Sequence, residues 1–380
     1  MELNARKLFA ITMAVAALTG NVSAQIPDLM TALDTGGRAM GLGGGTYVTD
    51  ANTWSINANP AGLGYIRTTT FGIAYRNLPN SVNGVSGDFA DPIFDTSLTG
   101  GANALTHLGY AAPLGNGTLG ISYTRSGFIH DRRSGTGLAD GALTIRNYNE
   151  LMKAQTDLFT ISWGRTLGNG TTNVGFGLVV ANQYVKNDLA YDIFNGNTFV
   201  GSVLADNTGN STGIGAVAGV QFSPGGSSNS SIGLSIQTPI ELSGSSVLDP
   251  YYSRIPGRAS IGFAVRTDSS NSLNYVLYGL QANYFFGGDS SGILSRKDHA
   301  TYGGGFEYMM HRWGAQVPIR FGVSIISDGG DGFNNRNTLN FGIGYRPIGG
   351  DYSVDLSLAK PVDGNQIDLA LSLTIITGSR

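Results

Sequence analysis

The chain has 380 residues, of which 41% are hydrophobic and only 13% are charged, whereas a soluble domain usually carries about a quarter charged residues. The formal net charge of −3 argues against a nucleic-acid partner, and the absence of cysteine excludes disulfides and thiolate metal sites. The low charge content indicates that much of the surface does not face bulk water.

Residues 1–24 are predicted to be a signal peptide. Arg6 and Lys7 supply the positive charge, residues 8–18 form the apolar stretch, and small side chains precede a cleavage site after Ala24. No later apolar run reaches about 18 residues, so no membrane-spanning helix is expected. The protein is therefore expected to be exported from the cytoplasm of a Gram-negative bacterium and not to remain in its inner membrane.

Residues 25–64 lack any regular alternation of apolar and polar side chains. They contain a glycine-rich run, Gly37–Gly45, and an Asn59-Pro60-Ala61 motif. An asparagine before proline favours an extended or turn conformation, and its amide can bond the nearby backbone. Glycines permit close backbone packing. We expect a compact plug, and the sequence leaves open whether it is static or moves as a gate.

From residue 65 onward, apolar side chains alternate with small or polar ones. Leu339, Phe341 and Ile343, for example, alternate with Asn340 and Gly342. This rhythm is typical of barrel strands with one face toward lipid and one toward a lumen. Fourteen such runs are expected, near residues 65–77, 104–113, 118–131, 156–167, 172–186, 212–223, 231–242, 257–268, 272–286, 300–312, 316–327, 336–347, 351–360 and 366–377.

The connections between these runs alternate between short and long. The short ones are rich in Asn-Gly and Gly-Gly, which suit tight hairpins, whereas the long ones are 78–103, 132–155, 187–211, 243–256, 287–299 and 328–335. Short periplasmic turns and long outer loops distinguish an outer-membrane barrel from a soluble sandwich. The predicted fold is therefore all-β, a transmembrane antiparallel β-barrel of about fourteen strands over residues 65–380, with residues 25–64 as a hatch in its lumen.

A few side chains are candidates for special roles inside this barrel. If the hairpin turns symmetrically about Trp313 and Gly314, Glu307 and Arg320 lie opposite each other in the lumen as an ion pair; the alternative is a simple lining of a wet lumen. Gly127 in the third strand marks a candidate kink of the wall.

Three patterns are candidates for catalysis or metal binding. Gly288–Gly292 matches G-x-S-x-G but lies in a loop, and the four histidines lack ligand spacing. Asp328–Gly332 lacks the carboxylate order of a calcium loop. No enzyme activity, cofactor or metal is expected.

Two N-terminal motifs, Gly37–Gly44 and Asn59–Leu63, and three C-terminal runs, 306–308, 317–322 and 341–346, resemble those of FadL-type outer-membrane transporters and the related PorV-like barrels. The resemblance implies an inward-folded hatch beside which hydrophobic ligands bind before they leave sideways through the wall. The matching hatch and gating residues are Gly37, Arg38, Gly41, Gly43, Gly44, Asn59, Pro60 and Ala61.

The resulting functional hypothesis is passive uptake of hydrophobic compounds, such as long-chain fatty acids, across the outer membrane. The partners are then outer-membrane lipids and a hydrophobic small molecule. One alternative is a PorV-like role in protein secretion or surface attachment, with secretion-system proteins as partners. The other is a general diffusion porin.

Overall fold

The computed structural model describes residues 36–78, 94–100, 102–138, 143–168, 170–224, 229–244, 254–268, 274–288, 297–327, 336–362 and 367–377. The predicted signal peptide, residues 1–24, and the first part of the predicted hatch lie outside these ranges. The described residues contain three short helices, α2 (Gly37–Gly41), α3 (Ser55–Ala58) and the 3-10 helix η1 (Pro60–Tyr65).

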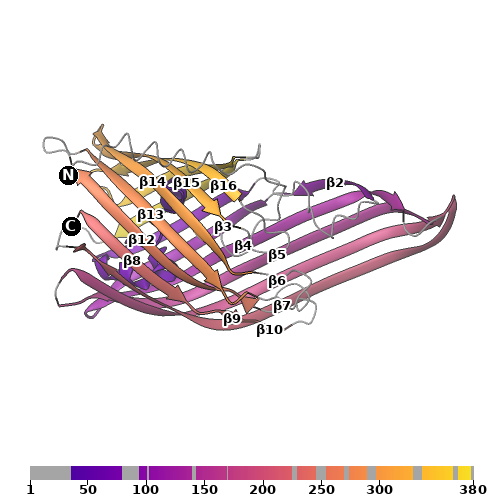
Figure 1. The fold of residues 1–380 in the computed structure, drawn as a ribbon, viewed down its shortest axis with the longest axis horizontal. Helices are drawn as coiled ribbons and strands as arrows, with labels where there is room; N and C mark the ends of the chain where they lie inside the picture. The colour runs from indigo at the N-terminus through magenta and orange to yellow at the C-terminus, as the bar shows by residue number, and fades with distance from the viewer. Residues whose placement is uncertain are drawn as a thin grey trace.

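Fourteen antiparallel strands close into a barrel (Figure 1), which confirms the predicted fold class. Neighbours in the ring follow the order of the chain, and β1 pairs with β18 to close it. The strands of the ring are β1 (Thr69–Leu78), β3 (Ala102–Leu114), β4 (Gly117–Leu138), β5 (Leu143–Thr166), β6 (Thr172–Asn195), β7 (Thr198–Phe222), β8 (Ser230–Gln237), β12 (Gly257–Asp268), β13 (Tyr275–Phe286), β14 (His299–Arg312), β15 (Ala315–Ile326), β16 (Arg336–Pro347), β17 (Tyr352–Pro361) and β18 (Asp368–Thr377).

Four short strands lie off this ring. β2 (Phe94–Gly100) pairs with β4, and β10 (Ser243–Gly244) pairs with β7. β9 (Ile240–Glu241) and β11 (Arg254–Ile255) pair with each other in the connection between β8 and β12. Ile240 is fully buried. The described start of this connection, at Ile240, therefore packs against the barrel.

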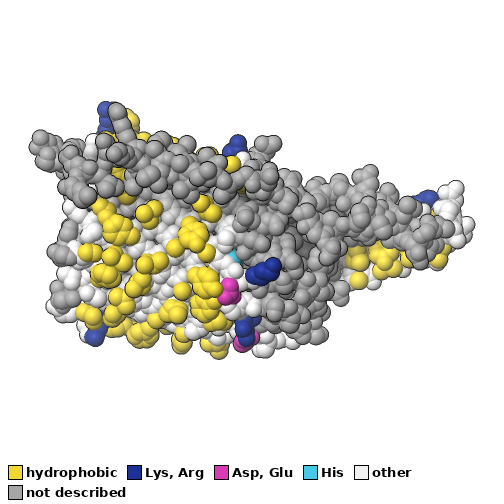
Figure 2. Space-filling model, viewed as in Figure 1, with side chains coloured by type: hydrophobic (Ala, Val, Ile, Leu, Met, Phe, Trp, Pro, Cys, Tyr) yellow, Lys and Arg dark blue, Asp and Glu magenta, His cyan; other side chains and the backbone are white. Residues whose placement is uncertain are grey.

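The outer and inner faces of the wall differ as the alternation predicts. In β1, Phe71, Ile73 and Tyr75 are exposed, whereas Ala74 and Arg76, which alternate with them, are buried. Figure 2 shows apolar side chains spread over the outer face of the barrel. Such a surface is stable where lipid replaces water, because only the inward positions then need polar partners.

The strands β4 to β7 are 22 to 25 residues long, although about 9–11 residues suffice to cross a membrane. Their outer halves therefore project beyond the barrel as two long hairpins (Figure 1). The prediction that residues 132–155 and 187–211 are loops is wrong. We call the described residues of 131–153 and 186–210 the arm.

The opposite end of the barrel has tight turns, as predicted. Gly115, Gly314 and Gly349 each have a positive φ of 62° to 69°, which glycine adopts without steric cost. Such turns fix the register of their hairpins. The arm and these turns therefore lie at opposite ends of the molecule.

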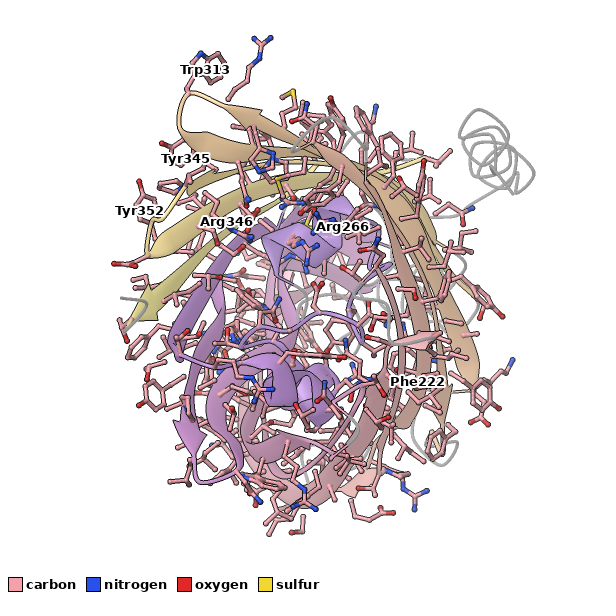
Figure 3. All side chains as sticks on the ribbon, turned by 90° about the vertical axis from the view of Figure 1, so that its left-hand side faces the viewer. Phe222, Arg266, Trp313, Tyr345, Arg346 and Tyr352 are labelled. Atoms are coloured by element: carbon pink, nitrogen blue, oxygen red, sulfur yellow. The ribbon has the colours of Figure 1, made fainter. Side chains whose placement is uncertain are left out.

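Residues 36–66, which we call the lumen segment, lie inside the ring of strands (Figure 3). Leu42, Val48, Ile56 and Leu63 have no exposed surface. Ile56 and Leu63 form one apolar cluster with Ala111 of the wall. The interior of the barrel is thus a packed core built around this segment.

Within the described residues, no helix is both long enough and apolar enough to cross a membrane.

Candidate functional site

A network of five charged side chains joins the lumen segment to the wall. The Glu307 carboxylate accepts hydrogen bonds from Arg38 at 3.1 and 3.2 Å and from Arg320 at 2.6 Å. The second guanidinium edge of Arg38 lies 2.6 Å from Asp50, and Arg320 lies 2.6 Å from Asp355. Glu307 is therefore the only carboxylate in this network that bonds both arginines.

The network is nearly closed to water. Glu307 has no exposed surface and Arg320 is 1% exposed, whereas the Arg38 side chain is 26% exposed. Two positive and three negative groups lie together, so each charge has an opposite partner. A buried charge without such a partner costs several kcal/mol. The lumen segment is thus joined to the wall at this point through Arg38, which bonds Glu307 of β14 on one side and Asp50 of the same segment on the other.

The predicted pair of Glu307 and Arg320 lies directly opposite in the β14–β15 hairpin. Its register follows from the tight turn at Trp313 and Gly314. Arg38 was predicted as a hatch residue without a partner, and Asp50 was missed. No periodic signal links residues that are 269 positions apart, such as Arg38 and Glu307.

Glycines let the lumen segment lie against the backbone of the wall. A Cβ placed on Gly303 of β14 would overlap the carbonyl oxygen of Gly43, and one on Gly322 of β15 would overlap the backbone at Leu42. Gly43 itself has a φ of +63°. Inward glycines of two neighbouring strands therefore form a flat strip on which residues 42–44 rest.

The other predicted glycines of this run have separate surroundings. The Gly37 N–H donates to Ser372 Oγ at 3.1 Å, and its carbonyl accepts from Ser357 at 2.5 Å. A Cβ on Gly41 would lie 2.8 Å from the Ser357 hydroxyl, whereas one on Gly44 would meet nothing within 4 Å. Gly44 instead borders open space above the segment.

Asn59 fastens the other end of the lumen segment. Its Oδ1 accepts from the Ala61 N–H at 3.2 Å, and its Nδ2 donates to the Val48 carbonyl at 2.8 Å and to the Val220 carbonyl of β7 at 3.4 Å. Asn59 is fully buried with an extended φ of −156°. Pro60 and Ala61 begin η1 directly after it. One amide thus closes the turn and joins it to the wall.

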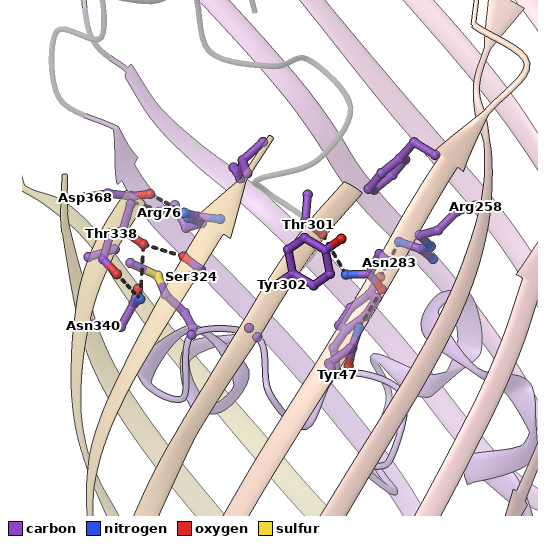
Figure 4. Close-up of a pocket in the computed structure, with 18 residues that line it drawn as sticks. Tyr47, Arg76, Arg258, Asn283, Thr301, Tyr302, Ser324, Thr338, Asn340 and Asp368 are labelled. Atoms are coloured by element: carbon purple, nitrogen blue, oxygen red, sulfur yellow. Dashed lines mark hydrogen bonds and ion pairs between the residues drawn. The ribbon is translucent and has the colours of Figure 1, made fainter. Parts of the chain in front are cut away.

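A cavity of about 120 Å³ lies in the lumen beside Met40, Gly43, Gly44 and Tyr47 (Figure 4). On β14, the cavity is lined by residues 301–303, which are farther along the strand from the turn at residue 313 than Glu307 is. The cavity and the charged network therefore lie on opposite sides of the lumen segment. The apolar side chains at this cavity include Met40, Phe285 and Ile326, and the polar ones include Arg76, Arg258, Asn283, Thr301 and Asp368.

The polar side chains of this cavity bond one another. Arg76 of β1 forms an ion pair with Asp368 of β18, and Asn283 donates to Thr301 at 2.9 Å (Figure 4). Arg258 donates to the Tyr47 hydroxyl at 3.1 Å and lies over its ring. Arg76 and Arg258 were missed from the sequence.

The wall changes at the level of the predicted kink. The ladder between β3 and β4 ends at the pair His107 and Thr124, and the register between β4 and β5 shifts between Arg125 and Gly127. Ser126 is therefore the extra residue of a bulge. A small cavity of about 20 Å³ adjoins Ser126 and Leu158 and shares Arg258 and Phe285 with the larger cavity.

An aromatic pair from the lumen segment and the wall lies beside this break. The Trp54 ring stacks on His107 with 4.5 Å between ring centroids. The two His107 nitrogens lie 3.1 Å from the Thr53 hydroxyl and 3.2 Å from the Thr124 hydroxyl. The lumen segment therefore contacts the wall where the β3–β4 ladder ends.

Asp328–Gly332 and, apart from Gly288, the Gly288–Gly292 motif lie outside the described residues. Within the described ranges, no group of three or more His, Asp or Glu side chains is arranged to hold a metal ion.

No protein-family model matches the sequence, and none of the curated proteins compared with it matches either. Solved structures do match. A Pseudomonas aeruginosa FadL homologue aligns over 93% of this chain and 99% of its own, with 13% identity and a TM-score of 0.63. The Ralstonia pickettii toluene transporter TbuX aligns over 92% of this chain and 100% of its own, with 13% identity and a TM-score of 0.57.

A third match is the P. putida toluene transporter TodX, which covers 93% of this chain and 100% of its own, with 11% identity and a TM-score of 0.55. At these identities the likeness concerns the fold. The resemblance to FadL-type barrels is confirmed at that level.

Proposed function

We propose that this chain is an outer-membrane channel for the passive uptake of hydrophobic compounds, with the lumen segment as its hatch. The observation that carries this proposal is the arrangement of the lumen. A closed barrel holds a segment that is joined to the wall by ion pairs and hydrogen bonds, and a cavity lies on one side of this segment. No catalytic step and no cofactor are required.

The chemistry of the cavity favours a compound with an apolar body and one polar group. Met40, Phe285 and Ile326 offer apolar contact, while Arg258 and Asn283 place a guanidinium and an amide at the cavity surface. Its volume of about 120 Å³ is close to the roughly 150 Å³ of a cavity that holds benzene. A small aromatic compound would fit the closed form, and a long-chain fatty acid would require the lumen segment to move.

The break in the wall supports a lateral route of exit. The small cavity beside Ser126 shares residues with the larger one, and it adjoins the end of the β3–β4 ladder. Its volume of about 20 Å³ holds no more than a water molecule. Passage therefore requires rearrangement at Ser126 and at the contact between Trp54 and His107.

Binding of a long-chain fatty acid to the refolded barrel tests the proposal. We expect saturable binding that Asn59→Ala weakens, because the variant leaves the Ala61 N–H and the Val48 carbonyl without their partner. Each such buried group costs about 1–3 kcal/mol, so the variant should also lower the free energy of unfolding. Tryptophan fluorescence in a urea titration measures the second effect, and titration calorimetry measures the first.

Asn210→Ala is the matched control, because Asn210 is exposed on the arm. It should change neither the affinity nor the stability. Toluene serves as a second, smaller probe. The absence of saturable binding of both compounds to the wild type would contradict the uptake proposal.

The projecting arm favours a second candidate, a PorV-like role through protein contacts. Co-purification of a defined secretion component with the barrel from native membranes, together with no binding of hydrophobic probes, would support it. A general diffusion porin would instead show a steady aqueous conductance with the lumen segment in place.

A further inference from the structure

In the part of the chain that the structure describes, the arm has one edge with a further partner strand and one edge without. β2 adds to the edge formed by β4 through pairs from Phe94 and Gly137 to Gly100 and Asp131. On the opposite edge, β7 pairs with β8 and β10 only from residue 211 onward. Among the described residues, Phe199–Gly209 has a partner strand on one side alone, which is β6.

The direction of the free backbone groups on this edge follows from the ladder below it. Both the N–H and the C=O of Ala216 bond Thr238, on the side away from β6. Residues of an antiparallel strand alternate in direction, and the β6–β7 register is continuous from Gly201 to Phe222. Ser202, Leu204, Asp206 and Thr208 therefore direct their N–H and C=O groups away from β6.

The side chains of this edge carry little of the usual protection against strand pairing. Natural edges carry charges (above all lysine), proline or bulges; Ser202–Thr208 contains one charge, Asp206, and neither lysine nor proline, and the bulge of this strand lies before it, at residues 199–201. The Leu204 side chain is 84% exposed. Asp206 lies opposite Asp188 of β6, and Lys186 pairs with Asp188 at 2.8 Å, so two neighbouring carboxylates share one lysine. A basic side chain on an added strand would give Asp206 a partner of its own.

We propose that this edge binds an extended segment of another protein, which adds to the arm as an antiparallel strand next to β7. Main-chain hydrogen bonds to Ser202–Thr208 hold it in register. In an antiparallel strand, the residue beside Asp206 precedes the residue beside Leu204 by two positions. The segment therefore reads basic, any residue, apolar from its N-terminus.

A second copy of this chain does not fit the same edge. Two copies in one membrane have the same orientation, so their β7 strands would run parallel. In a parallel pair, the hydrogen bonds are slanted, so a residue bonds residues that are offset from it along the partner strand. A two-fold axis along the strands would place the same residue of both copies at the same height. The offset that parallel pairing needs would therefore be missing. The occupant is therefore a separate polypeptide.

A labelled ten-residue peptide of alternating Val and Thr, with Lys two positions before its central Val, tests the proposal by fluorescence anisotropy on the detergent-solubilised barrel. Saturable binding is expected. Replacing Lys with Glu should weaken it about fivefold. Leu204→Pro should weaken binding about tenfold or more, because proline has no N–H to bond the peptide. The variant should still fold, because proline is tolerated at an edge position whose N–H faces away from the sheet.

A peptide with N-methyl groups on the amides that face β7 provides a readout on the wild type, independent of any folding defect in the variant. It should not bind, whereas methylation of the opposite amides should have little effect. Fatty-acid binding by Leu204→Pro should equal that of the wild type. Absence of peptide binding, or equal binding by Leu204→Pro, overturns the proposal. A wild-type dimer that Leu204→Pro converts to a monomer would also overturn the proposal, because the edge would then bind a second copy of this chain.

Discussion

Glu307→Gln is expected to release the lumen segment from the wall and to destabilise the protein by about 3–5 kcal/mol, the usual cost of removing one partner from a buried ion pair. Glu307 bonds both Arg38 and Arg320. Glutamine keeps the shape but loses the charge and one acceptor atom, so the two guanidinium groups would face each other without the carboxylate between them. A urea titration in lipid vesicles measures the loss.

Trp54 reports on the lumen segment in the same experiment. It is 7% exposed, whereas Trp313 is 83% exposed, so a variant with Trp163→Phe and Trp313→Phe isolates its signal. Glu307→Gln should make Trp54 accessible to acrylamide. Glu241→Gln is the control, because Glu241 pairs with Arg254 at the surface and such pairs contribute little. Equal stability and quenching in both variants would contradict the role of the network.

Gly303→Ala is expected to displace the lumen segment without changing any charge. The added Cβ would overlap the Gly43 carbonyl oxygen. Because β14 is paired with a strand on either side, its backbone cannot give way, and the lumen segment has to shift. Overpacking of this kind costs about 1–3 kcal/mol or more. We expect single-channel recordings in a planar bilayer to show open events that are rare in the wild type.

Gly201→Ala is the matched control for this substitution. Gly201 also lies in a strand, and a Cβ there would meet nothing within 4 Å. Its conductance and its unfolding midpoint should equal those of the wild type. If Gly303→Ala behaves like Gly201→Ala, the packing of residues 42–44 on the glycine strip does not keep the barrel closed.

The barrel was predictable because a wall with an apolar outer face and a polar inner face imposes a strict contrast between successive residues. Leu339 and Ile343 are exposed on the outer face, and Asn340 between them is buried. The same contrast fails in the arm, where both faces of a strand lie in water. Residues 187–211 therefore have the composition of a loop, although they are strand.

The site was predictable only in part, for reasons of distance along the chain. Glu307 and Arg320 are 13 positions apart across one tight turn, so their register follows from the turn. Asp50, Arg76 and Trp54 find their partners through the closure of the ring and the path of the lumen segment. No local pattern encodes those contacts.

A reversible lock on the lumen segment tests most directly whether it is a gate for hydrophobic compounds. A Cβ at Gly37 would lie 2.9 Å from Ser372 Oγ, close enough for a disulfide, and the chain has no cysteine of its own. The measurement is uptake of a labelled long-chain fatty acid by Gram-negative cells that lack their own fatty-acid channel and carry Gly37→Cys with Ser372→Cys.

We expect uptake under reducing conditions, loss of uptake on oxidation, and no effect of oxidation on either single-cysteine variant. Equal uptake by the oxidised and the reduced double variant would contradict a moving hatch. Uptake no higher than in cells without the protein, for the wild type as well, would contradict the channel function itself.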